Sequence, residues 1–154
     1  MKSTSKILSI VFLLFGCFVS QSASAQMVIG SPASHCQPGF PHVAINSWAY
    51  NTSPNTWGYI TCGFGLKGKA TTLYVDTLDS SSAEWIHCQL SVWNFTQTTQ
   101  LYSAVKNTGW EESGNRTLTF NIPAVSGYGY LLCSIPETQG GPYSGIRGIT
   151  YGPM

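Results

Sequence analysis

The stretch that most constrains the fold is residues 83–94, AEWIHCQLSVWN, where polar and apolar residues alternate. Successive side chains of a β-strand point to opposite faces, so this period of two predicts a strand with one buried face. That face would hold Ile86, Cys88, Leu90 and Val92. Residues 127–136 repeat the pattern, with Leu131, Cys133 and Ile135 on one side. We expect these two strands to form the centre of the fold.

The chain begins with the features of a secretory signal peptide. Lys2 and Lys6 precede an apolar run over residues 7–19, and small residues lead to a cleavage site after Ala25. We therefore expect residues 1–25 to be removed, leaving residues 26–154 as one domain of a secreted or periplasmic protein that has no membrane association after cleavage. The alternative is a lipid anchor on Cys17, because LFGC loosely resembles a bacterial lipobox.

Four cysteines remain after residue 25, and an even number in an exported chain predicts two disulfides. Three pairings are possible. Facing positions on the two alternating strands favour Cys88–Cys133, which leaves Cys36–Cys62. A zinc site is the alternative, but the chain has no C-x-x-C pair and the spacings are wide. We therefore predict no metal and no cofactor.

Charged residues are scarce, at 8% of the chain. Without Lys2 and Lys6, five basic residues stand against six acidic ones, so no long-range field attracts nucleic acid. A surface built from Ser, Thr, Asn, Gln and Gly is typical of an extracellular β-protein. About eight short strands separated by turn residues predict an all-β, antiparallel β-sandwich stapled by disulfides. They cover residues 43–50, 57–64, 70–78, 83–94, 100–105, 116–122, 127–136 and 144–151.

Aromatic residues are the most distinctive candidates for function, because all 5 Trp and 8 Tyr lie beyond the signal peptide. Flat rings stack on sugars, while amides and hydroxyls bind sugar hydroxyl groups. The candidate ligand-binding residues are Trp48, Trp57 and Trp110 near loops, and Trp85 and Trp93 on the outward face of the central strand. The alternative is that these rings fill the core or the strands.

Other groups give weaker signals for chemistry. His87 is a candidate base or ligand, although a lone strand histidine is usually a surface residue. Asp76 and Asp79 are possible calcium ligands, but their setting favours turn capping. A glycosidase needs two carboxylates facing one cleft, and the few acids present would meet only through tertiary structure. No G-x-S-x-G motif is present, so we predict no enzyme.

Three segments carry a resemblance to other proteins: LYVDTLDSSSAEWIHCQL, YGYLLCSIP and SGIRGITYG. With the early Cys36 and with Cys62, they resemble a group of uncharacterised exported bacterial β-proteins. Gly63 stands where that group often has proline. The resemblance implies export and a sandwich fold, and it implies no activity.

The sequence thus favours a secreted binding module that does not catalyse, with a glycan as the expected ligand. The alternative is a structural or protein-interaction module with an extracellular protein partner. A small hydrolase is the third hypothesis.

Overall fold

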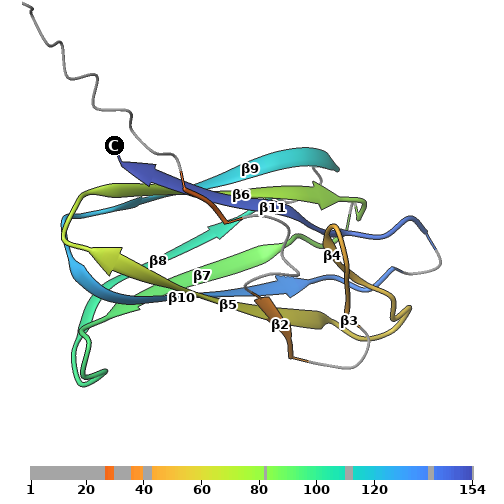
Figure 1. Ribbon diagram of the computed structural model, residues 1–154. Helices are drawn as coiled ribbons and strands as arrows, with labels where there is room; N and C mark the ends of the chain where they lie inside the picture. Colours follow the sequence, from red (N-terminus) through yellow and green to blue (C-terminus); the bar gives the residue numbers. More distant parts are fainter. Residues whose placement is uncertain are drawn as a thin grey trace, which may run out of the picture.

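The protein is a two-layered β-sandwich (Figure 1). Its structure is a computed structural model that describes residues 27–29, 36–39, 43–81, 83–109, 113–138 and 141–153. The expected signal peptide and Trp110 lie outside these residues. All regular structure in the described part of the chain is β-strand, which confirms the predicted fold class. No described segment forms a helix long and apolar enough to cross a membrane.

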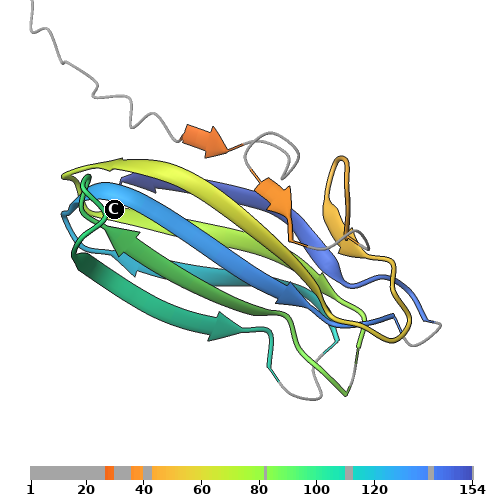
Figure 2. The same ribbon diagram turned by 90° about the horizontal axis from the view of Figure 1, so that it is seen from below.

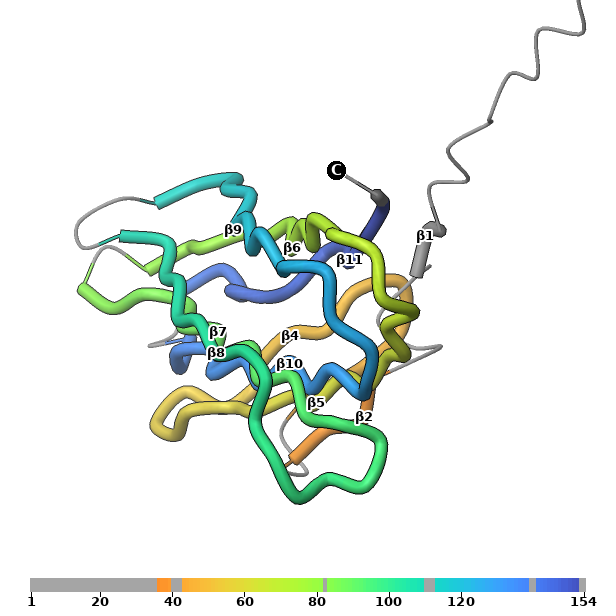
Figure 3. The backbone as a smooth tube through the Cα atoms, turned by 90° about the vertical axis from the view of Figure 1, so that its left-hand side faces the viewer, coloured from red at the N-terminus to blue at the C-terminus, as the bar shows by residue number. Residues whose placement is uncertain are grey.

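Sheet A, whose long strands β6, β9 and β11 form the upper layer of Figure 1, has the order β3-β4-β11-β6-β9, with β1 also paired to β11. Its strands are β1 (Met27–Ile29), β3 (Val43–Ile45), β4 (Ala49–Asn51), β6 (Thr71–Asp79), β9 (Gly114–Ile122) and β11 (Gly145–Pro153). Sheet B has the order β2-β5-β10-β7-β8 and faces sheet A, as the end-on view shows (Figure 3). Its strands are β2 (Cys36–Pro38), β5 (Gly58–Lys67), β7 (His87–Trp93), β8 (Gln100–Asn107) and β10 (Ser126–Ile135).

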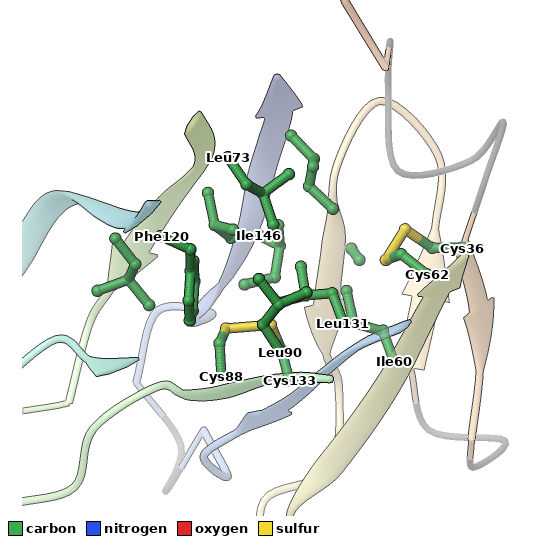
Figure 4. Packing of buried hydrophobic residues seen from close by; sticks show 14 of the residues in the cluster. Cys36, Ile60, Cys62, Leu73, Cys88, Leu90, Phe120, Leu131, Cys133 and Ile146 are labelled. Carbon is green, nitrogen blue, oxygen red and sulfur yellow. A yellow bond between two sulfur atoms is a disulfide. The ribbon is translucent and has the colours of Figure 1, made fainter. Parts of the chain in front are cut away.

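The core lies between the two sheets and is built by the alternation that the sequence shows (Figure 4). The predicted apolar faces of β7 and β10 are fully buried. Phe120 of β9 and Leu73 of β6 meet them from sheet A. Each fully buried side chain of this size stabilises the fold by roughly 1.5–3 kcal/mol relative to exposure.

Both disulfides lie within sheet B and join residues that face each other on neighbouring strands. Cys88 of β7 faces Cys133 of β10, and Cys36 of β2 faces Cys62 of β5. Both expected pairings are therefore confirmed. Since β2 has only three residues, its disulfide secures a short edge strand to the sheet seen from below in Figure 2.

Some strand boundaries differ from the sequence prediction for identifiable reasons. The central strand begins at His87, because side chains and not a neighbouring strand accept the Ile86 backbone N–H. Its acceptors are Asp79 Oδ2 at 3.1 Å and Thr108 Oγ1 at 3.0 Å. β5 continues to Lys67, through residues expected to form a loop, because Ser126 of β10 pairs with it there.

Candidate functional site

The outer face of sheet A carries a cationic side chain because of an irregularity in β11. Ile146 and Ile149 are both buried although they lie three residues apart, which strict alternation forbids. A β-bulge between Ile146 and Gly148 resolves the conflict by inserting an extra residue. Both isoleucines therefore face the core, and Arg147 between them is exposed.

An open hollow of about 450 Å³ lies beside Arg147, over β6, β9 and β11. Its polar side chains include Asp76, Asn115 and Thr117. Thr117 Oγ1 donates a hydrogen bond of 2.7 Å to Asp76 Oδ1, and Arg147 Nη1 donates one of 2.8 Å to Asn115 Oδ1. These cross-strand bonds orient one carboxylate, one amide and one guanidinium on the same face before any ligand arrives.

A second open hollow, of about 500 Å³, adjoins the first, because Arg147 lines both. Its other lining residues are Ser47, Trp48 and Leu78. Trp48 ends the turn between β3 and β4, and its backbone N–H donates to Asn46 Oδ1 at 3.2 Å. The indole is half-buried, so one part of the ring packs on the protein and another part reaches the hollow.

Three aromatic rings follow one another from this hollow towards the end of the sheet. The Trp48 and Tyr50 rings stack, with centroids 4.7 Å apart and planes at 28°. Tyr50 and Tyr143 follow at 5.0 Å and 45°. Tyr143 is 45% exposed, so a ligand can reach this end of the run. We call these three rings with Asp76, Asn115, Thr117 and Arg147 the outer-face site.

Of the predicted tryptophans that the structure describes, Trp48 alone lines the outer-face site. Trp48 lies in the outer-face site, whereas Trp93 ends β7 in the opposite sheet. Trp57 and Trp85 are half-buried just before β5 and β7, and Trp110 lies outside the described residues. The tyrosines, Asp76, Asn115, Thr117 and Arg147 were not among the predicted ligand-binding residues. The sequence pattern of any one strand could not have predicted them as a site, because they come from four strands of sheet A and an adjacent loop.

Five of the six large apolar side chains that are exposed among the described residues lie in or beside sheet B instead. Phe95, Leu101, Val105, Tyr128 and Leu132 are each at least 39% exposed, and they belong to β8, β10 and the loop after β7. The Phe95 and Tyr128 rings make an edge-to-face contact, with centroids 5.3 Å apart. We call these five residues the sheet B patch.

Two carboxyl groups do meet at the end of the sandwich that follows β10. β7 and β10 are antiparallel, with His87 opposite Ser134, so Glu84 before β7 is brought to Glu137 after β10. Burial raises the pKa of Glu84, repulsion by Glu137 and a hydrogen bond that the protonated Glu84 donates to Glu137 raise that pKa further, and Asp79 makes a smaller contribution. One oxygen of each glutamate, Oε2, is buried without a hydrogen-bond partner.

Glu84 and Glu137 act on one another directly, because Glu137 raises the pKa of Glu84 by repulsion and by hydrogen bonding. A glycosidase instead holds its two carboxyls about 5–9 Å apart on either side of the scissile bond. Glu137 borders a hollow of about 180 Å³. The sequence could have predicted the pair once Cys88 was set opposite Cys133. In an antiparallel register, the residue four places before Cys88 lies opposite the residue four places after Cys133, and these are Glu84 and Glu137.

Asp79, the last residue of β6, accepts hydrogen bonds from the segments around the end of that strand. It is completely buried, and its Oδ1 accepts hydrogen bonds from Ser81 N and Ser144 Oγ. Its Oδ2 accepts from Ile86 N and from Thr108 Oγ1. Asp76 is exposed on the outer face, so the two aspartates do not form a joint calcium site. Among the described residues, no group of three acidic, histidine or cysteine side chains could hold a metal ion.

Comparison with known proteins shows the fold. No family model and no curated protein matches the sequence. The enzymatically active domain of tailspike protein 4 from bacteriophage CBA120 matches with a TM-score of 0.54 and 11% identity, over 84% of this chain. The chain spans only 21% of that tailspike chain. The carbohydrate-binding module TmCBM61, solved with β-1,4-galactotriose, matches with a TM-score of 0.50 and 12% identity, over 77% of this chain and 87% of the module.

Proposed function

We propose that the protein is a secreted, non-catalytic carbohydrate-binding module, and that its glycan binds at the outer-face site. The observation that carries this proposal is the place of Trp48, which lines the same hollow as Arg147 at the head of a run of three aromatic rings. Small-molecule sites combine apolar and aromatic walls with a few fixed polar groups. The outer-face site has this composition.

Each part of the site matches a part of a sugar. The exposed part of the Trp48 ring would stack on the apolar C–H face of a pyranose. The adjoining Asp76 and Asn115 would bind its hydroxyl groups, because a carboxylate accepts hydrogen bonds and an amide both donates and accepts them. The hydrogen bonds from Thr117 and Arg147 already orient these two side chains, which lowers the entropy lost on binding.

The arrangement of carboxylates supports binding without catalysis. Asp76 is the single acidic residue among the described residues that line the two hollows of the outer-face site. Glycoside hydrolysis ordinarily needs a second carboxylate across the bond. The two disulfides are typical of extracellular or periplasmic proteins, which fits export.

Tryptophan fluorescence of the mature protein, titrated with soluble polysaccharides, tests the proposal. We expect a saturable change with at least one glycan. Trp48→Ala should weaken that binding by about tenfold, the equivalent of a stacking contribution near 1.4 kcal/mol. Trp93→Ala is the matched control, because Trp93 lies in sheet B, and it should bind as the parent does. Equal binding by Trp48→Ala and the parent would overturn the assignment of the site.

The sheet B patch supports a second candidate function, an interaction with an extracellular protein. Exposed apolar side chains that lie together often mark protein contacts. Leu132→Lys would place a charge in the patch and should abolish binding of a protein partner without changing glycan binding. If this variant lost glycan binding while remaining folded, the glycan would belong on sheet B.

A further inference from the structure

Arg147 gives the hollow beside Trp48 a positive charge. Of the described residues that line this hollow, Arg147 alone is charged, and the others are Ser47, Trp48 and Leu78. The adjoining hollow is also lined by Asp76 and Arg116, whose opposite charges leave the two hollows together with a net charge of +1. The volume of about 500 Å³ lies within the roughly 300–1,000 Å³ of small-molecule sites.

The Arg147 guanidinium is held in place without being neutralised. In the described part of the chain its single hydrogen bond goes from Nη1 to the amide oxygen of Asn115, which carries no charge. No described carboxylate forms an ion pair with Arg147, and the nearby Asp76 accepts its hydrogen bond from Thr117 instead. Because a guanidinium has five N–H donors, most of them remain for a ligand.

Such a guanidinium is suited to one class of ligand group. Its planar fork matches the two oxygens of a carboxylate or sulfate, and bidentate pairs of this kind are among the strong hydrogen bonds of proteins. A neutral hydroxyl uses one donor and leaves the charge without a partner. Arg147 is the extra residue of the β-bulge, so its side chain lies on the outer face between two buried isoleucines.

We infer that the bound glycan is anionic, and that a sugar oxyanion pairs with Arg147 while the ring of that sugar stacks on Trp48. This inference rests on the proposed function. The shared chemistry is an oxyanion on a pyranose, which either a uronic acid carboxylate or a sulfate ester supplies. Trp48 and Arg147 lie on one hollow, so a single sugar unit can contact both.

Isothermal titration calorimetry with charge-matched glycans tests the inference. The probes are oligogalacturonate, its neutral methyl ester, alginate oligosaccharide, chondroitin sulfate and neutral β-1,4-galactotriose. We expect at least one anionic glycan to bind about tenfold or more tightly than the neutral ones, with an affinity that falls as salt rises. Preference for a uronate or for the sulfated glycan identifies the source of the oxyanion, and either result supports the inference.

Variants at position 147 separate charge from packing. Arg147→Gln should remove the preference for anionic glycans but retain weak binding through Trp48. Arg147→Lys keeps the charge without the planar fork, so its affinity should be intermediate. Lys69→Gln removes an exposed charge in the turn between β5 and β6, outside the site, and should bind as the parent does.

Two results would contradict the proposals in distinguishable ways. Trp48-dependent binding of neutral and anionic glycans with equal affinity, unchanged in Arg147→Gln, would overturn the inference and leave the proposed function intact. No binding of any glycan by the folded parent protein would overturn the proposed function itself.

Discussion

The indole ring of Trp48 lies directly against Gly145, on the neighbouring strand of sheet A. A Cβ atom at position 145 would stand 2.9 Å from Trp48 Cε3, and it would lie closer still to the carbonyl oxygen of Ala49. Such distances are shorter than van der Waals contact, so glycine is the residue that allows this approach. The absence of a side chain at position 145 thereby lets the Trp48 ring lie against β11.

Gly145→Ala should therefore displace the Trp48 ring and weaken the pairing of β4 with β11. We expect unfolding to become easier by about 1–3 kcal/mol, the usual cost of overpacking, together with a change in Trp48 emission. Thermal melting with fluorescence checks both effects. Gly63→Ala is the control, since a Cβ there meets nothing within 4 Å, and it should melt like the parent. Identical behaviour of the two variants would show that position 145 tolerates a side chain.

Removing the Cys88–Cys133 disulfide should cost more stability than removing Cys36–Cys62. Loop entropy for sequence separations of 45 and 26 residues gives about 4.0 and 3.5 kcal/mol. All four cysteines are buried in the core, but Cys36 keeps 8% exposure whereas Cys88 and Cys133 have none, so alanines at 88 and 133 leave the more enclosed cavity. Urea unfolding of the two double-alanine variants measures the difference. A larger loss for the Cys36–Cys62 variant would contradict the expected order.

Asp79→Asn should destabilise the protein by about 2–3 kcal/mol, because one acceptor oxygen becomes an NH₂ group that faces existing donors. The buried carboxylate accepts four hydrogen bonds at the end of β6. Asp76→Asn is a matched substitution on the same strand, exposed and with one hydrogen bond, and should cost less than about 1 kcal/mol. The midpoints of urea unfolding compare the stability of the two variants. Equal losses of stability in Asp79→Asn and Asp76→Asn would refute the structural role of Asp79.

Glu84 should make stability fall as pH rises. Its pKa is higher in the folded protein than in the unfolded chain, chiefly through burial and then through Glu137, so the folded state holds the proton more tightly. This carboxyl therefore favours folding below its ordinary pKa, and the contribution is lost as pH rises through the raised pKa.

Glu84→Gln removes the ionisable carboxyl, and the amide N–H groups that replace it can still donate a hydrogen bond to Glu137. Near neutral pH the variant should be more stable than the parent, by less than about 1 kcal/mol because water screens a partly exposed pair. In acid the two proteins should converge. Urea unfolding from pH 4 to pH 8 measures the difference, and parallel profiles for both proteins would rule out this role of Glu84.

Much of the fold could be predicted from local patterns. The period of two over residues 86–92 places four side chains on one face, and all four are fully buried. The same alternation puts Cys88 and Cys133 on the buried faces of their strands, which favoured the disulfide that the register between β7 and β10 then allows. Alternation is a property of the backbone of a single strand, so it can be predicted without knowing the partner strand.

The outer-face site could not be predicted in that way. The sequence predicted Trp48 as a ligand-binding residue, but it predicted the four other tryptophans equally and did not single out Trp48. Arg147 reaches the outer face through a β-bulge, which alternation alone does not reveal. The Glu84–Glu137 pair similarly depends on the register between β7 and β10.

The sequence by itself determined the β-sandwich class and favoured the disulfide pairs, because strand periodicity is encoded in local order and places Cys88 and Cys133 on buried faces. Tertiary structure alone decided which aromatic and polar side chains meet. Trp48, Asp76, Asn115 and Arg147 lie far apart in sequence, and they converge because sheet A aligns β4, β11, β6 and β9 side by side. The physical reason is that strand order and register depend on the packing of the whole core, to which every strand contributes.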